Sequence, residues 1–261
     1  MLWKASAIND YAIVASDGRI GTVIDLLFDD ASWLVRWMVV DTGNWLSGRK
    51  VLLPPSVLGH PDLKRRAFSV RLTMNQVKDS PDIDTDRPVS RQMETKIYDY
   101  YGWSPYWGTG FYMGGYGFMG GMGGAMAATP PIGAMQHEKE NSDTRRNDDD
   151  PHLRSIEAVT GYNIRATDGE IGHVEDFLVE DADWSIHYLI VDTKNWWPAK
   201  KVLISPRSAR KIEWAHKLVN INVDRQTVKD SPAYDASTTV DCAYEKQFQS
   251  YYGAAPPSDR P

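Results

Sequence analysis

Two pairs of carboxylates recur at matching places in the sequence and are the first residues that could carry chemistry. They are Asp25 with Asp176 and Asp41 with Asp192. Acid–base catalysis needs a titrating or nucleophilic partner within reach, and no histidine or nucleophile recurs beside them. Asp41 and Asp192 end apolar runs, where an aspartate side chain often bonds to the backbone of a turn. We therefore expect these carboxylates to be structural, and we predict no catalytic residue and no enzymatic activity.

Sulfur and imidazole groups do not have the spacing of metal ligands. Met119, Met122 and Met126 offer thioethers, which suit Cu(I), although a segment biased towards Gly and Met explains them equally well. Cys242 is the only cysteine, so it has no cysteine partner for a zinc site. The histidines, which show no ligand spacing among themselves, are His60, His137, His152, His173, His187 and His216. We predict no bound metal and no cofactor.

Aromatic side chains remain as candidates for anchoring a partner protein, a role in which they are common. Trp45 and Trp196 occupy matching places after a turn. Trp103, Trp107 and Tyr112 lie at the start of a segment rich in glycine. We predict these five residues as partner-binding residues.

The chain repeats itself at a constant offset of 151 residues, and this repeat positions all the candidates above. Asp-Gly-Arg-Ile-Gly-Thr-Val-Ile-Asp at 17–25 returns as Asp-Gly-Glu-Ile-Gly-His-Val-Glu-Asp at 168–176. Val-Lys-Asp-Ser-Pro at 77–81 returns at 228–232, and Tyr-Tyr-Gly at 100–102 returns at 251–253. A repeat far longer than 20–50 residues indicates duplicated domains rather than a solenoid.

Each repeat reads as short strands followed by helices. Apolar and β-branched runs bounded by Gly, Pro and Asp predict strands at 11–14, 22–28, 33–40, 49–53 and 68–72. Thr73 is a suitable cap for a short helical turn through Val77. Ser90 is placed to cap a helix over 91–101 that ends at Gly102, and the second repeat copies it between Asp241 and Gly253. Short strands at short intervals favour a small barrel or sandwich.

These motifs resemble the PRC-barrel domain family. The resemblance lies in the Asp-Gly-x-Ile-Gly-x-Val-x-Asp run, the Val-Asp-Thr strand end and a Val-Leu-(Leu/Ile)-x-Pro strand, over about 2–82 and 153–233. It implies a small, partly open β-barrel that docks on other macromolecules. The family includes the cytoplasmic domain of the photosynthetic reaction-centre H subunit and is similar to the C-terminal domain of the ribosome-maturation factor RimM. The H subunit's membrane helix and RimM's separate N-terminal barrel have no counterpart in this sequence.

The segment between the repeats has an unusual composition. No charged residue occurs from Trp103 to Gln136, which is long enough to span a membrane. It is dense in glycine, and each glycine in a helix costs about 1 kcal/mol relative to alanine, so a spanning helix is disfavoured. A flexible linker is the main interpretation, and an adhesive tether that binds a partner or a membrane surface is the alternative. The charged part at 136–151 is predicted to be a solvated spacer.

Composition excludes some classes of function. The net charge is −6, so the chain lacks the positive balance typical of nucleic-acid binders, although Lys64-Arg65-Arg66 forms a local basic cluster. A single cysteine allows no intrachain disulfide and favours a reducing compartment. The first ten residues lack the apolar run of a secretion signal. We expect a cytoplasmic protein, with peripheral contact to the inner membrane as an alternative.

The sequence therefore predicts a mainly β protein with two small, partly open antiparallel β-barrels, each followed by a short C-terminal helix. The predicted domains are 1–102, a linker over 103–152, 153–253 and a disordered tail over 254–261. The predicted function is a non-enzymatic interaction or scaffold module for a protein partner. Self-association is also expected, either between the two repeats as a pseudo-dimer or between whole chains. The alternatives are a membrane-associated modulator of electron transfer that resembles the H subunit, and a RimM-like RNA-associated factor.

Overall fold

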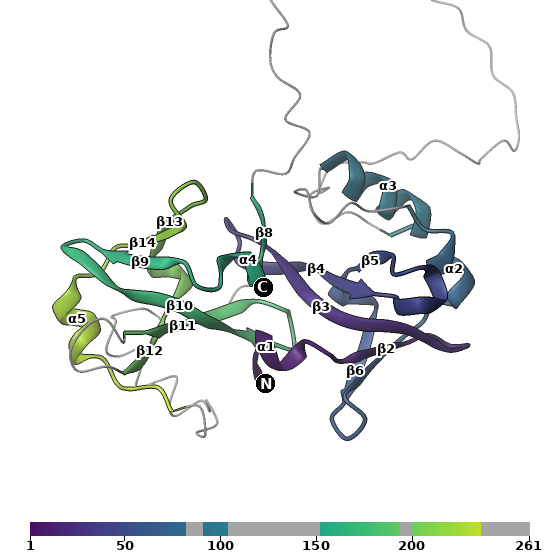
Figure 1. Ribbon diagram of the computed structural model, residues 1–261, viewed down its shortest axis with the longest axis horizontal. Coiled ribbons are helices and arrows are strands. Elements are labelled where there is room, and N and C mark those ends of the chain that lie inside the picture. Colours follow the sequence, from purple (N-terminus) through teal and green to yellow (C-terminus); the bar gives the residue numbers. More distant parts are fainter. Residues whose placement is uncertain (82–90, 104–151, 194–199, 236–261) are drawn as a thin grey trace, which may run out of the picture.

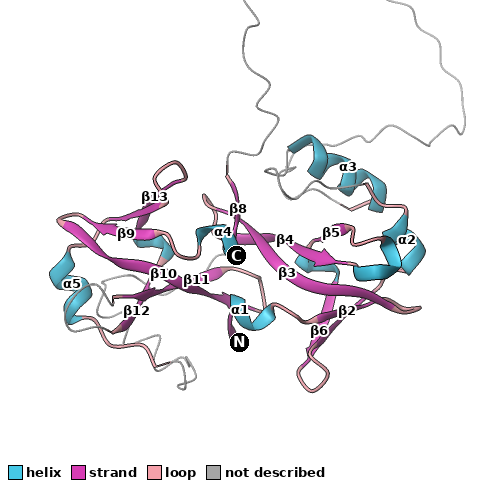
Figure 2. Cartoon of the chain, viewed as in Figure 1, coloured by secondary structure: helices cyan, strands magenta, loops and turns pink. Residues whose placement is uncertain are grey.

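The computed structural model describes residues 1–81, 91–103, 152–193 and 200–235, and all structural statements below refer to these ranges. We call residues 1–103 the first half and residues 152–235 the second half. Two seven-stranded sheets, one built on each half, lie side by side (Figures 1 and 2). The predicted mainly β fold with two similar units is confirmed.

The elements follow the same order in both halves. The first half contains β1 (Leu2–Lys4), α1 (Ala5–Ile8), β2 (Ala12–Val14), β3 (Arg19–Asp29), β4 (Leu34–Asp41), η1 (Gly43–Leu46), β5 (Lys50–Leu53), η2 (Pro55–Val57), β6 (Leu58–Asp62), β7 (Ala67–Val70), α2 (Met74–Lys78) and α3 (Arg91–Tyr101). The second half contains β8 (Leu153–Ser155), α4 (Ile156–Val159), β9 (Asn163–Ala166), β10 (Gly169–Glu180), β11 (Ile186–Asp192), β12 (Lys201–Ile204), η3 (Pro206–Ser208), β13 (Ala209–Glu213), β14 (Leu218–Ile221) and α5 (Arg225–Asp230).

The two sheets share one topology. Their hydrogen-bonded orders are β5-β4-β3-β2-β7-β6 and β12-β11-β10-β9-β14-β13, and neither path of described strands closes into a ring. All ladders are antiparallel except β2 with β7 and β9 with β14, which are parallel. This one departure from an antiparallel barrel arises because the chain crosses over through η2 or η3 instead of turning back in a hairpin.

The seventh strand of each sheet comes from the other half. β1 pairs with β10 of the second half, and β8 pairs with β3 of the first half. The two halves thus exchange their N-terminal strands, and β1, α1, β8 and α4 lie in the middle of the molecule (Figure 1). The domain limits 1–102 and 153–253 stay a prediction, because the sheets do not divide where the repeats do.

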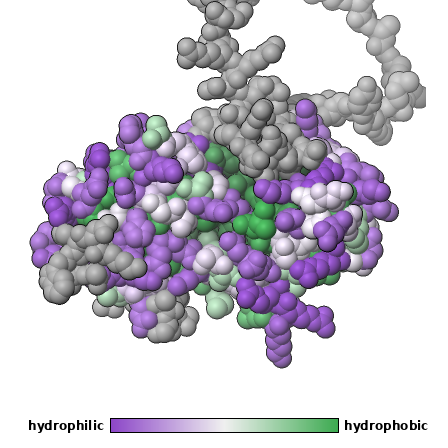
Figure 3. Space-filling model, viewed as in Figure 1, coloured by the Kyte–Doolittle hydropathy of each residue, from purple (hydrophilic) through white to green (hydrophobic). Residues whose placement is uncertain are grey.

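One hydrophobic core runs through both halves. It joins Val23, Phe28 and Met38 of the first half to Val174 and Phe177 of the second half. Side chains on the opposite faces of the long strands form separate clusters. Hydrophilic side chains dominate the outer ends of the face seen in Figure 3, and hydrophobic surface shows mainly towards the middle.

The helix limits agree with the residues Thr73 and Gly102, while Ser90, which is predicted to cap α3, lies outside the described residues. The Thr73 hydroxyl accepts a hydrogen bond from the Gln76 amide at 3.2 Å, and the Gln76 side chain accepts one from the Thr73 amide at 2.9 Å. α3 spans the predicted residues, and Gly102 follows it with φ +67°, a conformation that glycine adopts without steric cost. The matching helix predicted between Asp241 and Gly253 lies outside the described residues.

α3 packs on the face of the first sheet that points away from the shared core. Ile97 and Tyr98 contact a cluster that contains Trp37 and Leu52. The Trp37 indole N–H donates to a carboxylate oxygen of Glu94 at 2.6 Å, and both side chains are fully buried. Burying a carboxylate is costly unless it accepts such bonds, so this contact fixes where the helix sits on the sheet.

Candidate interaction site

The Asp-Gly start of the repeated motif holds the short helix that follows the sheet. An oxygen of Asp17 accepts a hydrogen bond from the Met74 amide at 2.8 Å, and Asp168 accepts one from the Arg225 amide at the same distance. These amides belong to the first turns of α2 and α5, which have no partner inside the helix. Gly18 lies under Met74, since a Cβ there would be 2.5 Å from the Met74 sulfur.

The second glycine of the motif lets two strands approach each other closely. A Cβ on Gly21 would lie 2.0 Å from the carbonyl oxygen of Asp41, and a Cβ on Gly172 would lie 2.1 Å from that of Asp192. No side chain fits at these separations. The glycine is therefore needed for the contact of β3 with β4 and of β10 with β11.

The last aspartate of the motif anchors the exchanged segment of the other half. Asp25 accepts hydrogen bonds from the Ser155 hydroxyl at 2.5 Å and from the Glu157 amide at 3.1 Å. In the matching place, Asp176 accepts hydrogen bonds from the Ser6 hydroxyl at 2.5 Å and the Ser6 amide at 3.2 Å. The repeated carboxylates are thus turned towards chain segments and serve the pairing of the two halves.

Burial raises the pKa of the Asp25 carboxyl above its ordinary value, because desolvation disfavours the charged form. The hydrogen bonds from Ser155, Glu157 and the adjacent Leu26 amide oppose this rise because they favour the ionised form. Burial thus disfavours the charged form of the carboxylate, and three hydrogen-bond donors partly offset this effect.

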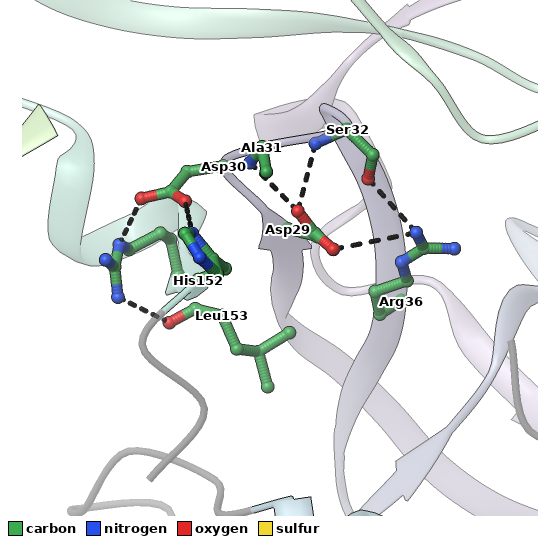
Figure 4. Close-up of polar contacts among 8 residues, drawn as sticks. Asp29, Asp30, Ala31, Ser32, Arg36, His152 and Leu153 are labelled. Carbon is green, nitrogen blue, oxygen red and sulfur yellow. Dashed lines mark hydrogen bonds and ion pairs between the residues drawn. The ribbon is translucent and has the colours of Figure 1, made fainter. Parts of the chain in front are cut away.

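A second carboxylate in each half lies opposite the exchanged strand. The Asp30 carboxylate lies between the Arg154 guanidinium, at 2.7 Å, and the His152 ring, at 2.9 Å (Figure 4). The matching Asp181 accepts a longer bond, 3.3 Å, from the indole of Trp3. Asp181 is also ion-paired with the Met1 amine at 2.5 Å, so the two places differ in having Arg154 at one and Trp3 at the other.

The turns that follow these carboxylates meet where the two halves contact each other, a region that we call the seam. The Val35 amide donates to the Trp184 carbonyl at 2.9 Å, and the Ile186 amide donates to the Trp33 carbonyl at 2.8 Å. Trp33 and Trp184 both have positive φ, 58° and 60°. The neighbouring Asp29 carboxylate accepts from the turn amides of Ala31 and Ser32 and faces Arg36 at 3.6 Å (Figure 4). The two backbone bonds between Trp33, Val35, Trp184 and Ile186 join the halves in the same way as bonds within a sheet.

The predicted partner-binding residues fall in different places. Trp45 lies in η1, is 36% exposed, and its indole N–H donates to the Ile20 carbonyl. Trp103 is partly buried and stacks on Tyr101, with ring centres 4.1 Å apart and nearly parallel. Trp196, Trp107 and Tyr112 lie outside the described residues. Among the described members of the set, Trp45 is the one on the surface.

Trp214 was not singled out as a candidate residue from the sequence. It is the first residue of the turn between β13 and β14 and is 38% exposed. It contacts Tyr162 edge-on at 5.8 Å, and the Arg154 guanidinium lies 4.9 Å from its ring centre. The first repeat has Leu63 in the matching position, so the repeat gave no signal for an aromatic residue here.

The basic cluster at residues 64–66 belongs to a turn. Asp62 accepts from the amides of Lys64 and Arg65, both at 3.0 Å. Arg66 donates to the Asn9 carbonyl at 3.2 Å and lies over the Tyr11 ring at 5.3 Å. The Arg65 guanidinium lies 3.7 Å from the Asp62 carboxylate, so both arginines of the cluster have partners within the first half.

Two kinds of feature are absent from the described part of the chain. It contains no group of three or more His, Cys, Asp and Glu side chains close enough to share a metal ion. None of its helices combines the length and the apolar character needed to cross a membrane.

Comparison with known proteins identifies the first of the two units. Residues 4–73 match the model of the PRC-barrel domain. A 75-residue stretch is 36% identical to an uncharacterized protein of Deinococcus radiodurans, and it covers 29% of this chain and 27% of that protein. The chain thus spans about a quarter of the relative's length. The second half repeats the matched topology strand for strand.

Proposed function

We propose that this chain, whose residues 4–73 are a PRC-barrel domain, is a non-enzymatic interaction module that docks on a protein partner. One observation carries the proposal: the repeated polar residues are used to hold the fold. Asp17 caps a helix, Asp25 anchors the exchanged segment, and Asp41 accepts from the Gly43 amide at 2.8 Å. The PRC-barrel is a non-catalytic type of domain, which supports the same conclusion.

Trp45 is the residue of the first half that we assign to the docking surface. Its side chain is partly exposed while its indole N–H donates to the Ile20 carbonyl, so its rotamer is fixed before a partner binds. A side chain that is already ordered loses less entropy on binding, which favours affinity. Exposed tryptophans are also enriched among residues that dominate binding energy. The proposal places the protein in the cytoplasm.

The experiment is affinity enrichment with the intact chain, followed by titration of the enriched protein in purified form. Trp45→Ala is expected to weaken binding at least tenfold, since a central tryptophan contributes about 2 kcal/mol or more. The matched control is Leu63→Ala, which removes another exposed apolar side chain of the same half, 56% exposed. Urea unfolding of both variants separates lost binding from lost stability.

Equal binding by Trp45→Ala and the intact chain would contradict the assigned surface. A chain that enriches no protein, but sediments with vesicles or retains RNA at low salt, would instead support one of the two alternative functions. The membrane alternative concerns residues 103–136, of which the structure describes Trp103.

A further inference from the structure

The exchanged strand fills an edge that its own half leaves open. β2 pairs with β3 only at residues 19–22, while β8 pairs with the same strand at residues 27–29. Without β8, the backbone N–H and C=O groups at this end of β3 would lack a ladder partner, and exposed edges of this kind readily accept another strand. The same holds for β10 and β1 in the second half.

Both edges receive their strand in the same register. Phe28 lies opposite Arg154 and Val179 lies opposite Trp3, which are matching positions in the repeat. Each segment then continues into a short helix, α1 or α4, whose first amide or hydroxyl groups bond to Asp176 or Asp25. Strand, helical turn and carboxylate together form one docking site, present twice.

These contacts depend on the two halves and do not involve the segment that joins them. We propose that each docking site also accepts the matching segment of a second copy of this chain. Two chains can then pair by exchanging residues 2–8 and 153–159, the first segments of the two halves. This inference stands apart from the proposed function, because it holds whether or not the chain binds another protein.

The polar residues at the seam favour pairing of a first half with a second half, also between chains. The Arg154 guanidinium bonds to Asp30 at 2.7 Å and stacks near Trp214. If two first halves paired instead, Trp3 would take the place of Arg154 opposite Asp30, so the guanidinium bond would be lost and the Met1 amine, which pairs with Asp181, would be the cation at that position. Two chains that exchange segments reciprocally keep every contact of the single chain.

The joining segment therefore decides how often the exchange occurs between chains. The covalent link between the two halves gives each half an effective concentration for the other on the order of 1 mM, so the intrachain arrangement dominates at micromolar concentration. When the chain is refolded at about 100 μM, on the order of a tenth of the molecules should pair, and about tenfold fewer at 10 μM. The paired form should then persist, because separation requires the shared core to open.

Disulfide trapping in the full chain tests the proposal. Leu2 lies opposite Glu180, and opposed residues in an antiparallel ladder have Cα atoms about 4.5–5.5 Å apart, within the range of a disulfide. In chains that also carry Cys242→Ser, one population carries Leu2→Cys and the other Glu180→Cys. The two are unfolded, mixed, refolded and oxidised, and the covalent heterodimer is measured. A chain with both cysteines reports the intrachain exchange.

The control replaces the second population by one with Glu170→Cys, an exposed residue of β10 away from Leu2, which measures chance collisions. We expect a heterodimer yield that exceeds the control at least fivefold and rises with concentration. A yield equal to the control, with complete intrachain linkage in the double-cysteine chain, would overturn exchange between chains. Failure of the double-cysteine chain to link would overturn the exchange itself. Light scattering of the unmodified chain refolded at both concentrations gives the same answer without substitutions.

Discussion

The Asp25 carboxylate is the contact through which the exchange of strands can be measured most directly. It accepts the Ser155 hydroxyl at 2.5 Å and the Glu157 amide at 3.1 Å from the second half, and the Leu26 amide at 2.8 Å from its own half. The perturbation is a double-mutant cycle of Asp25→Ala and Ser155→Ala in the full chain.

The expected magnitudes follow from these bonds. A hydrogen bond to an ionised group contributes about 1.5–3 kcal/mol, and Asp25→Ala removes two such bonds across the seam while relieving the desolvation of a buried carboxylate. We expect it to lower the free energy of unfolding by about 3 kcal/mol. Ser155→Ala should cost about 2 kcal/mol, because the hydroxyl also caps α4 by accepting from the Ala158 amide at 2.9 Å. The coupling energy should be about 1.5 kcal/mol.

The assay is urea unfolding of the four chains, with hydrogen exchange of the Glu157 amide as a local readout. A parallel cycle of Asp176→Ala and Ser6→Ala should give coupling of the same sign, because their contact is also 2.5 Å long. A mixed cycle of Asp25→Ala and Ser6→Ala, which share no contact, should be additive within about 0.5 kcal/mol. If the Asp25 and Ser155 effects are also additive, the reasoning about the exchanged segment is refuted.

Three further predictions concern single positions. Because burial raises the pKa of Asp25 in the folded chain, its ionised form costs stability at neutral pH, and this cost disappears as the pH falls through the folded pKa. The stability of the intact chain relative to Asp25→Asn, measured by urea titration, should therefore increase from pH 7 towards pH 4. A difference that stays constant with pH would contradict this. Gly21→Ala should lower the free energy of unfolding by about 3 kcal/mol, because its Cβ would lie 2.0 Å from a carbonyl oxygen of β4. Gly43→Ala, which has φ +61° but no atom within 4 Å of its Cβ, should lower it by about 1 kcal/mol. Equal shifts of the melting temperature would be evidence against the close approach at Gly21. Trp37→Phe should cost about 2–4 kcal/mol and release α3, since it removes the 2.6 Å bond to Glu94; unchanged hydrogen exchange in α3 would show that the bond does not hold the helix.

The sequence alone determined the local structure of each half. Alternation and turn residues placed β2, β3, β4, β5 and β7 close to their observed limits. The capping residue Thr73 and the terminal Gly102 marked the helix ends correctly. The constant offset predicted two units of the same fold. These features depend on residues near one another in the chain, so a local pattern is sufficient to specify them.

Sequence patterns missed the short strands β1, β6 and β8, and with β1 and β8 they missed the role of Asp25 and Asp176. Three residues such as Leu2–Lys4 carry no periodic signal, and their partners on β10 lie more than 170 positions away. Both sheets offer the same kind of edge and the same carboxylate, so the sequence is equally consistent with a strand that stays in its own half. Only the tertiary structure decided between them, because the choice depends on how the two halves meet along the shared core that contains Phe28 and Phe177.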